Sequence, residues 1–278
     1  MENILMFDKR VDNILFNFSG MVYMQKILLA LSVLGLSTGC TGGGDHNDSG
    51  HHASGNKHWS YVGMEGPSHW ASLSDEFGLC ESGNTQSPIN IAGEHQMNLR
   101  DIEFDYSDST DSVVVNNGHT IQVNYAAGSS ALIGGKKYNL LQFHFHSPSE
   151  HQIHGKHADL VAHLVHKSDD GQLAVVAVLF DRGANNSFLS PVWKVMPTAK
   201  GEAIVPGILR VEDLLPADKG YFNYSGSLTT PPCSEGVNWN ILTTHAPVSS
   251  AQVVAFAKIF PKSIRPVQNV NDRMIGVK

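Results

Sequence analysis

The sequence predicts a mostly β domain with a few short helices on its outside. Short runs of apolar and β-branched residues recur along the chain, separated by Gly, Pro, Asn and Asp, whereas amphipathic helical patterns are rare. The composition is that of an ordinary globular protein, with 41% hydrophobic and 16% charged residues. The region 58–278 is long enough for one domain with a sizeable core. The predicted strands are residues 113–115, 120–125, 139–146, 160–166, 173–180 and 237–243, and the clearest helix is 251–259.

The first 57 residues are predicted to precede this domain. Residues 1–20 have no evident partner in the rest of the sequence, and we interpret them as an extension from an upstream start, with translation beginning at Met21 or Met24. Residues 21–40 have the order of a secretory signal: a basic residue, an apolar run too short to span a bilayer, and then small residues. Residues 41–57 are rich in Gly, Asp, Asn, Ser and His, which indicates a flexible linker.

The three cysteines are interpreted in the light of the export that residues 21–40 predict. Cys40 ends a stretch that resembles the lipobox of bacterial lipoproteins, although Ser37 stands where that motif usually has Leu. Either a periplasmic protein or a lipoprotein anchored at Cys40 is therefore expected. Cys80 and Cys233 are the two cysteines inside the domain, and in an oxidising compartment they are expected to form a disulfide. The net charge of −7 gives no support to nucleic-acid binding.

The predicted strand 139–146 carries two histidines on one face. Strict alternation places Leu140, Gln142, His144 and His146 on one side of this strand, and Leu141, Phe143 and Phe145 on the other. A His-x-His pair alone is more often two solvated or core histidines than a metal site. In the next predicted strand, however, His163 shares a face with Val161 and Val165, and it can meet the first pair across the sheet. Three neutral imidazoles without a fourth protein ligand are typical of a catalytic zinc site, whose open position holds water.

Several segments together resemble the α-class carbonic anhydrases, in the form exported by bacteria. They occur in the order of that family and cover nearly all of the chain after Lys57. Any one of them could arise by chance, whereas the ordered set is highly specific. The segments are residues 58–61, 86–91, 116–119, 142–146, 149–151, 163–166, 227–233, 237–239 and 265–268.

The resemblance implies a fold, a cofactor and a reaction. The fold is a single α+β domain, mainly β, around a large, mostly antiparallel, twisted central sheet with short peripheral helices. The cofactor is Zn²⁺ bound by His144, His146 and His163. The reaction is the reversible hydration of CO2 to bicarbonate and a proton, by attack of a zinc-bound hydroxide on CO2. The implied substrate site has an apolar wall and one polar residue, namely Val165, Val175, Leu228, Val237 and Trp239 together with Thr230.

The resemblance also assigns catalytic roles. Thr229 accepts a hydrogen bond from the hydroxide and donates its own proton to a buried carboxylate, Glu150. His119 acts as the proton shuttle, a task that suits an imidazole because its pKa lies near the operating pH. His151 and His166 match positions that are structural, and both are expected to be core histidines with satisfied ring nitrogens.

One position departs from the family pattern. Gln142 matches the residue that supports His144 through its amide oxygen. The family places a glutamate two residues before the third histidine, and here that position is Val161, which cannot accept a hydrogen bond. Asp159 is too far along the strand to replace it directly. Loss of such a partner typically costs 10 to 100-fold in metal affinity or activity, so zinc is expected to be held less tightly.

Two other functions remain alternatives on the sequence alone. A carbonic-anhydrase-like binding module that has lost catalysis typically lacks the zinc histidines, and all three are present here. A zinc esterase would use the same nucleophile on a different substrate. The chain has no His-Glu-x-x-His signature, which argues against a common metalloprotease design. Whether the chain forms a homodimer is left open by the sequence.

Overall fold

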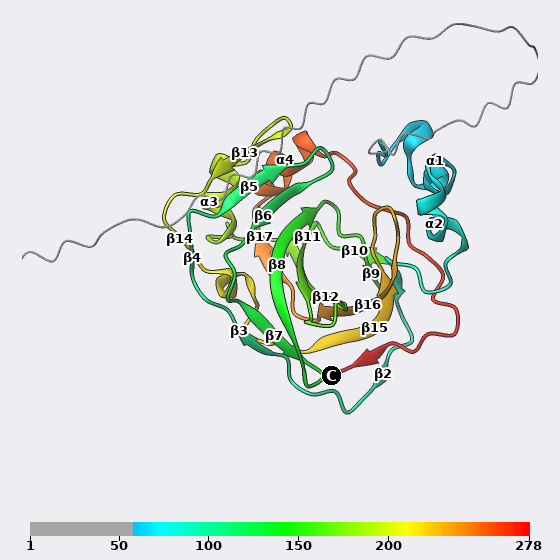
Figure 1. Cartoon of the computed structure of the whole chain (residues 1–278). Helices are drawn as coiled ribbons and strands as arrows, with labels where there is room; N and C mark the ends of the chain where they lie inside the picture. Colours follow the sequence, from blue (N-terminus) through cyan, green and yellow to red (C-terminus); the bar gives the residue numbers. More distant parts are fainter. Residues whose placement is uncertain (1–57) are drawn as a thin grey trace, which may run out of the picture. The chain divides into compact units, whose positions relative to one another are not determined.

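The computed structural model describes residues 58–278. The predicted extension, signal peptide, linker and Cys40 therefore lie outside the described residues. The described chain is organised around a 13-stranded mixed sheet, mostly antiparallel, with short helices outside it (Figure 1). The predicted fold class is confirmed. No helix in this part of the chain is both long and apolar enough to cross a membrane.

Five neighbouring strands form the centre of the sheet. They are β8 (Lys136–His146), β11 (Leu160–Lys167), β12 (Leu173–Arg182), β16 (Glu235–Leu242) and β15 (Tyr221–Ser227), in that spatial order. All pair antiparallel except β12 with β16. The strands that carry the histidines, β8 and β11, therefore lie near the middle of the sheet.

Shorter strands complete the large sheet at its edges. They are β13 (Gly201–Ile204), β5 (Val113–Asn116), β6 (Ile121–Asn124), β18 (Gly276–Val277), β2 (His95–Gln96), β3 (Glu103–Asp105), β7 (Ser130–Ile133) and β17 (Ala246–Val248). Two small sheets lie apart from it. They contain β1 (Asn90–Ile91), β9 (Gln152–Ile153) and β10 (Lys156–His157) in one, and β4 (Ser109–Thr110) and β14 (Ile208–Leu209) in the other.

The helices are short, as the sequence predicts. The α-helices are α1 (Trp70–Leu73), α2 (Leu79–Ser82), α3 (Leu189–Val195) and α4 (Ser250–Ile259), and the 3₁₀ turns are η1 (Gly63–Glu65), η2 (Pro67–His69), η3 (Asp75–Phe77) and η4 (Val211–Leu214). Helix α4 begins at a capping box, in which the Ser249 hydroxyl accepts from the Gln252 N–H and the Gln252 amide oxygen accepts from the Ser249 N–H.

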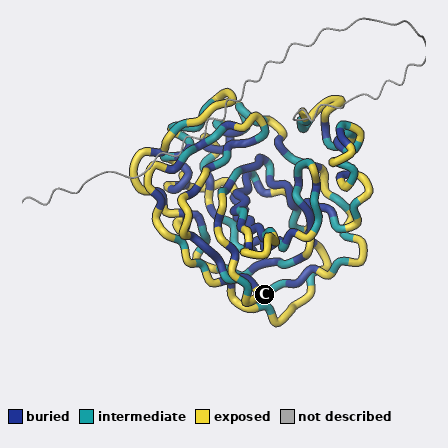
Figure 2. The backbone as a smooth tube through the Cα atoms, in the orientation of Figure 1, coloured by how far each residue is buried: buried dark blue, intermediate teal, exposed yellow. Residues whose placement is uncertain are grey.

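The two faces of the sheet bury different clusters. On one face, Phe143 and Phe145 of β8 pack with Leu164 of β11 and with Phe256 of α4. On the other face, Val161 of β11 packs with residues of β12 and β16. Figure 2 shows the buried residues following these central strands, with exposed residues in the outer loops. The metal-site histidines belong to the second face.

Strict alternation along β8 is wrong at two residues. Leu140 lies in the same core cluster as Phe143, and Leu141 is 46% exposed. The register explains the difference, since Val165 pairs with Gln142 whereas His166 pairs with Leu140, which leaves Leu141 as an extra residue in a bulge. Beyond this bulge the predicted alternation holds for Gln142, His144 and the two phenylalanines.

The predicted disulfide between Cys80 and Cys233 is present in the structure. It joins residues 153 positions apart and packs with Trp70 in a third buried cluster. Closing so long a loop stabilises the fold by about 4 to 5 kcal/mol in the chain-entropy model, less any strain.

His166 is the structural histidine that the sequence predicts. It is fully buried, its Nδ1–H donates to the Leu164 carbonyl at 2.9 Å, and its Nε2 accepts from the Tyr106 hydroxyl at 2.8 Å. Burial lowers the pKa of His166 to about 4. The ring therefore stays neutral and satisfied in the folded protein.

This shift predicts a pH dependence of stability. In the unfolded chain a histidine has a pKa of about 6.5, so between pH 6.5 and 4 the unfolded state binds more protons at this position. The free energy of unfolding should fall as the pH falls through that window, by up to about 1.4 kcal/mol per pH unit from His166 alone. Urea titrations at several pH values give the free energy of unfolding as a function of pH. In this window its pH dependence should be smaller by up to about one proton in His166→Gln than in the wild type. The exposed His157→Gln is the control and should keep the wild-type pH dependence. The same pH dependence in His166→Gln as in the wild type would contradict this account.

Candidate metal centre

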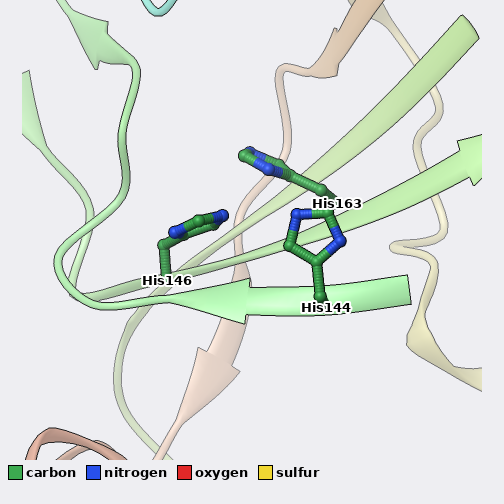
Figure 3. Close-up of side chains that lie close together, drawn as sticks. All are labelled: His144, His146 and His163. Carbon is green, nitrogen blue, oxygen red and sulfur yellow. The ribbon is translucent and has the colours of Figure 1, made fainter. Parts of the chain in front are cut away.

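Three histidines from two adjacent strands converge on one point (Figure 3). One ligand atom from each of His144, His146 and His163 lies within 4.8 Å of the other two. The antiparallel register places His144 of β8 directly opposite His163 of β11, and His146 follows two residues later on the same face. The three-histidine cluster that the sequence predicts is therefore confirmed.

Two of the rings have their orientation set by an acceptor behind them. The Nδ1–H of His144 donates to Gln142 Oε1 at 3.0 Å, as predicted. The Nδ1–H of His146 donates to the carbonyl of Ser263 at 2.6 Å, which the sequence did not reveal because a main-chain oxygen carries no residue-type signal. In both rings the Nε2 lone pair is left free for a metal.

The third ring has no such acceptor. His163 Nε2 is buried without a hydrogen-bond partner among the described residues. Its Nδ1 lies 3.9 Å from Glu150 Oε2, and the same oxygen lies 3.6 Å from His146 Nε2, so Nδ1 faces the metal side. Val161 is fully buried. Asp159 instead accepts from the Arg182 guanidinium at 2.8 Å. The predicted lack of a carboxylate partner for His163 is confirmed.

The environment favours the neutral form of two of the imidazoles, His144 and His163. His146 and His163 are each 1% exposed. Burial, followed by the neighbouring histidines, lowers the pKa of His144 and of His163 well below the usual value. Neutral imidazole is the form that binds a metal. His146 Nε2 is also buried without a partner in the described part of the chain, and a metal ion would satisfy it. The donor set and its burial thus fit zinc, which binds three histidines in catalytic sites.

Glu150 lies beneath the cluster. Its Oε1 accepts from the main-chain N–H of Arg265 at 3.0 Å, whereas its Oε2 is buried without a hydrogen-bond partner among residues 58–278. Thr229 is nearly buried, at 6% exposed, but no hydrogen bond joins its hydroxyl to Glu150 in this part of the structure. The hydrogen bond between Thr229 and Glu150 stays a prediction.

Tyr61 also lies near the cluster, although the sequence assigned it no role. Its ring lies 6.5 Å from that of His146. Burial, followed by the charge of Glu150, raises the pKa of Tyr61.

The predicted apolar wall is assembled beside the histidines. Val175, Val237 and Trp239 are each 2% exposed and belong to one buried cluster, against which Val165 and Leu228 pack. The Trp239 ring lies 5.0 Å from that of His163. These residues therefore form an apolar surface next to the metal ligands.

The loop that carries Thr229 and Thr230 is anchored through the disulfide. Thr230 is only half-buried, and its carbonyl accepts from the N–H of Cys233 at 2.9 Å. The N–H of Leu228 donates to the carbonyl of Ser234, also at 2.9 Å. Because Cys233 is bonded to Cys80, the turn that presents the two threonines is tied to the N-terminal part of the domain.

Arg265 is a buried hub whose role the sequence did not reveal. It is 2% exposed, and its guanidinium donates to the carbonyl of Cys80 at 2.7 Å and to Gln86 Oε1 and the Ser87 carbonyl at 2.8 Å. Burial lowers the pKa of Arg265 to about 10. Since its main-chain N–H holds Glu150, Arg265 connects the disulfide region to the carboxylate under the metal site.

His119 lies in the loop between β5 and β6, as an intermediate residue rather than a buried one. Its ring stacks on that of Trp59, with centroids 3.8 Å apart and an interplanar angle of 10°. Burial, followed by the charges of Lys200 and His58, lowers the pKa of His119. The stacking on Trp59 was not predicted, and the shuttle role stays a prediction.

Comparisons with known proteins find similar sequences and a similar fold. A family model described as eukaryotic-type carbonic anhydrase matches residues 65–278. A carbonic anhydrase of Neisseria gonorrhoeae is 43% identical over 220 residues, covering 78% of this chain and 87% of that protein. One from Nostoc sp. is 41% identical over 234 residues, covering 78% of this chain and 84% of that protein. The structure of the α-carbonic anhydrase of Thermovibrio ammonificans with the inhibitor sulfanilamide is 41% identical, with a TM-score of 0.77, and the match covers 80% of this chain and all of that one.

The unpartnered Nε2 of His163 yields a prediction for metal retention. In Val161→Glu, the new carboxylate can accept the Nε2–H of His163, and zinc release to a competing chelator should slow by about tenfold or more. Val161→Gln, which adds an amide oxygen without charge, is the matched control and should slow release less. If the wild-type protein holds zinc as long as Val161→Glu does, the account of this position is wrong.

Proposed function

The chain belongs to the eukaryotic-type, or α-class, carbonic anhydrase family, and from that premise we propose that it hydrates CO2 reversibly with zinc held by His144, His146 and His163. One observation carries the proposal. Three imidazoles, the buried rings of His146 and His163 and the partly exposed ring of His144, present ligand atoms within 4.8 Å of one another. Gln142 and Ser263 set the tautomers of two of them. When zinc is bound in such a site, it makes a nucleophile available near neutral pH by acidifying water.

The residues around the cluster bind and orient the reactants. The apolar surface of Val175, Val237 and Trp239 suits uncharged CO2, and it disfavours water at the position of the substrate. Glu150 Oε2 is available to accept the Thr229 hydroxyl proton, which would leave the threonine oxygen as an acceptor facing the nucleophile. The N–H of Arg265 holds the other carboxylate oxygen in place. Thr229 would thereby orient the nucleophile toward the carbon of CO2.

His119 is proposed to pass the product proton to buffer. Its lowered pKa keeps the ring unprotonated at neutral pH, so it can accept a proton and release it again. The stacking on Trp59 holds the ring at a half-exposed position, where buffer can reach it. Both properties are those expected of a relay between a buried site and solvent.

The two alternatives are weaker for different reasons. An inactive binding module would have no use for three converging histidines, two of which have ordered acceptors behind them. A zinc esterase would use the same residues, and ester hydrolysis is proposed only as a side activity of the same site.

We further propose that the protein works outside the cytoplasm of a bacterium. The support is the disulfide between Cys80 and Cys233 together with the signal-like residues 21–40. Anchoring through a lipid on Cys40 remains part of this proposal, with a free periplasmic form as the other outcome. Mass spectrometry of the mature N-terminus distinguishes the two.

Loss of one ligand should remove metal and activity together. His144→Ala leaves only two imidazoles, so zinc content measured by atomic emission should fall from one per chain to near zero, and CO2 hydration should fall to the buffer rate. His157→Ala removes an exposed histidine from β10 and is the matched control, which should retain both. Intact zinc with no CO2 hydration in the unmutated protein would reject the enzyme assignment.

Removal of the relay should have a different signature. His119→Ala should keep zinc and fold but lower kcat about 10 to 100-fold in weak buffer, because relays of this kind contribute about 10² to 10⁴-fold and buffer replaces them only in part. High concentrations of imidazole buffer should restore much of the rate. A kcat that does not depend on buffer concentration in His119→Ala would show that His119 is not the shuttle.

A further inference from the structure

Apart from His146 Nε2, which faces the metal site, two buried ring nitrogens have no partner in the described chain. They are Nε2 of His163 and Nδ1 of His151. The sequence predicts that His151 is a satisfied core histidine. The residue is buried, and its Nε2 has a partner, but its Nδ1 has no protein partner among the described residues. The two rings lie 6.3 Å apart between centroids, at an interplanar angle of 79°, and the Trp239 ring lies 5.0 Å from His163 and 4.6 Å from His151.

The hydrogen-bonding capacities of the two nitrogens are complementary. His163 presents Nδ1 to the metal side, so its Nε2 carries a hydrogen and is a donor. His151 Nε2 lies 2.6 Å from the Tyr224 hydroxyl, which in turn lies 2.7 Å from Ser87 Oγ. With the His151 Nε2–H donating to Tyr224 and Tyr224 donating to Ser87, Nδ1 of His151 is an acceptor.

The two rings are too far apart for a direct hydrogen bond, but one water molecule can bridge them. No direct hydrogen bond joins them in the described structure, whereas a single water reaches two partners that are each about 3 Å away. Buried waters characteristically satisfy polar groups that lack a protein partner. The carboxylate that would otherwise serve His163 is missing, because Val161 occupies that position on the same face of β11.

We propose that His151 is a positioning residue for the metal ligand His163, acting through one buried water that accepts from His163 Nε2–H and donates to His151 Nδ1. The link extends from His163 through His151 and Tyr224 to Ser87, which also accepts from the N–H of Ser227 at 3.0 Å. It fixes the tautomer and the orientation of the third ring, as Gln142 and Ser263 do for the other two. The proposal rests on the proposed function only in that His163 binds the metal.

Two substitutions at His151 separate the two ring nitrogens. His151→Gln can reach Tyr224 with its amide but has no polar atom at the position of Nδ1. His151→Asn keeps a polar atom near Nδ1 and loses the reach to Tyr224. Zinc release to a chelator should be about tenfold faster in His151→Gln, and close to the wild-type rate in His151→Asn. Equal release rates in the two variants, or a wild-type rate in His151→Gln, would overturn the proposal, since a packing role alone does not distinguish them.

The effect should also vanish when His163 has its own acceptor. In the Val161→Glu background, the introduced carboxylate serves His163 directly, so adding His151→Gln should leave the zinc release rate unchanged. A tenfold acceleration in that background as well would show that His151 acts through general destabilisation, and would overturn the proposal.

A spectroscopic test needs no substitution. In the zinc-loaded wild-type protein labelled with ¹⁵N-histidine, the Nε2–H of His163 should show cross-relaxation to a bound water. A proton without a water contact, shifted upfield by the face of Trp239, would mean that the N–H points at the indole instead and would overturn the proposal. Zinc content is measured first. A chain that binds no zinc would overturn the proposed function and the role of His151 with it, whereas bound zinc with unaffected release rates would overturn only the role of His151.

Discussion

The pairing register of β8 and β11 is the constraint on which the site depends. His144 lies opposite His163 only in this register, and a slip of one residue would turn one set of imidazoles toward the other face of the sheet. The opposite face fixes the register, because Phe143 and Phe145 pair with Leu164 and Ala162 in the large core. The bulge at Leu141 lies before the histidines in β8, so the pairing of the histidine segment with β11 stays regular. The apolar core therefore aligns the polar site.

A second set of contacts holds the site from below, and it joins segments that are far apart in the sequence. Arg265 binds the main chain at Cys80 and Ser87 through its side chain and Glu150 through its N–H. The disulfide ties the same region to the turn that carries Thr229. Buried polar groups that are fully partnered specify one arrangement. Among the described buried groups that lack a partner is Nε2 of His163, which lies on the same face of β11 as Val161.

The sequence predicted the features that residue type and periodicity can encode. Residue type and periodicity predicted the β class, the histidine cluster and the disulfide. The resemblance to the α-class carbonic anhydrases implied Gln142 behind His144 and the missing acceptor at Val161. The features that the sequence missed depend on the main chain or on long-range packing. Ser263 acts through a carbonyl, Arg265 through burial, and Leu141 through a bulge that breaks strict alternation. Whether Nδ1 of His151 has a hydrogen-bond partner depends on the atoms that surround it in the fold, and a local sequence pattern does not indicate that.

The most direct test of the account is the zinc K-edge X-ray absorption spectrum of the zinc-loaded protein. Three imidazoles on two strands, with no fourth protein ligand among the described residues, predict four-coordinate zinc. The shell should contain three imidazole nitrogens and one non-protein oxygen, all at about 2.0 to 2.1 Å. A sulfur in the shell, a fourth imidazole or a six-coordinate ion would contradict the arrangement from which the activity is inferred.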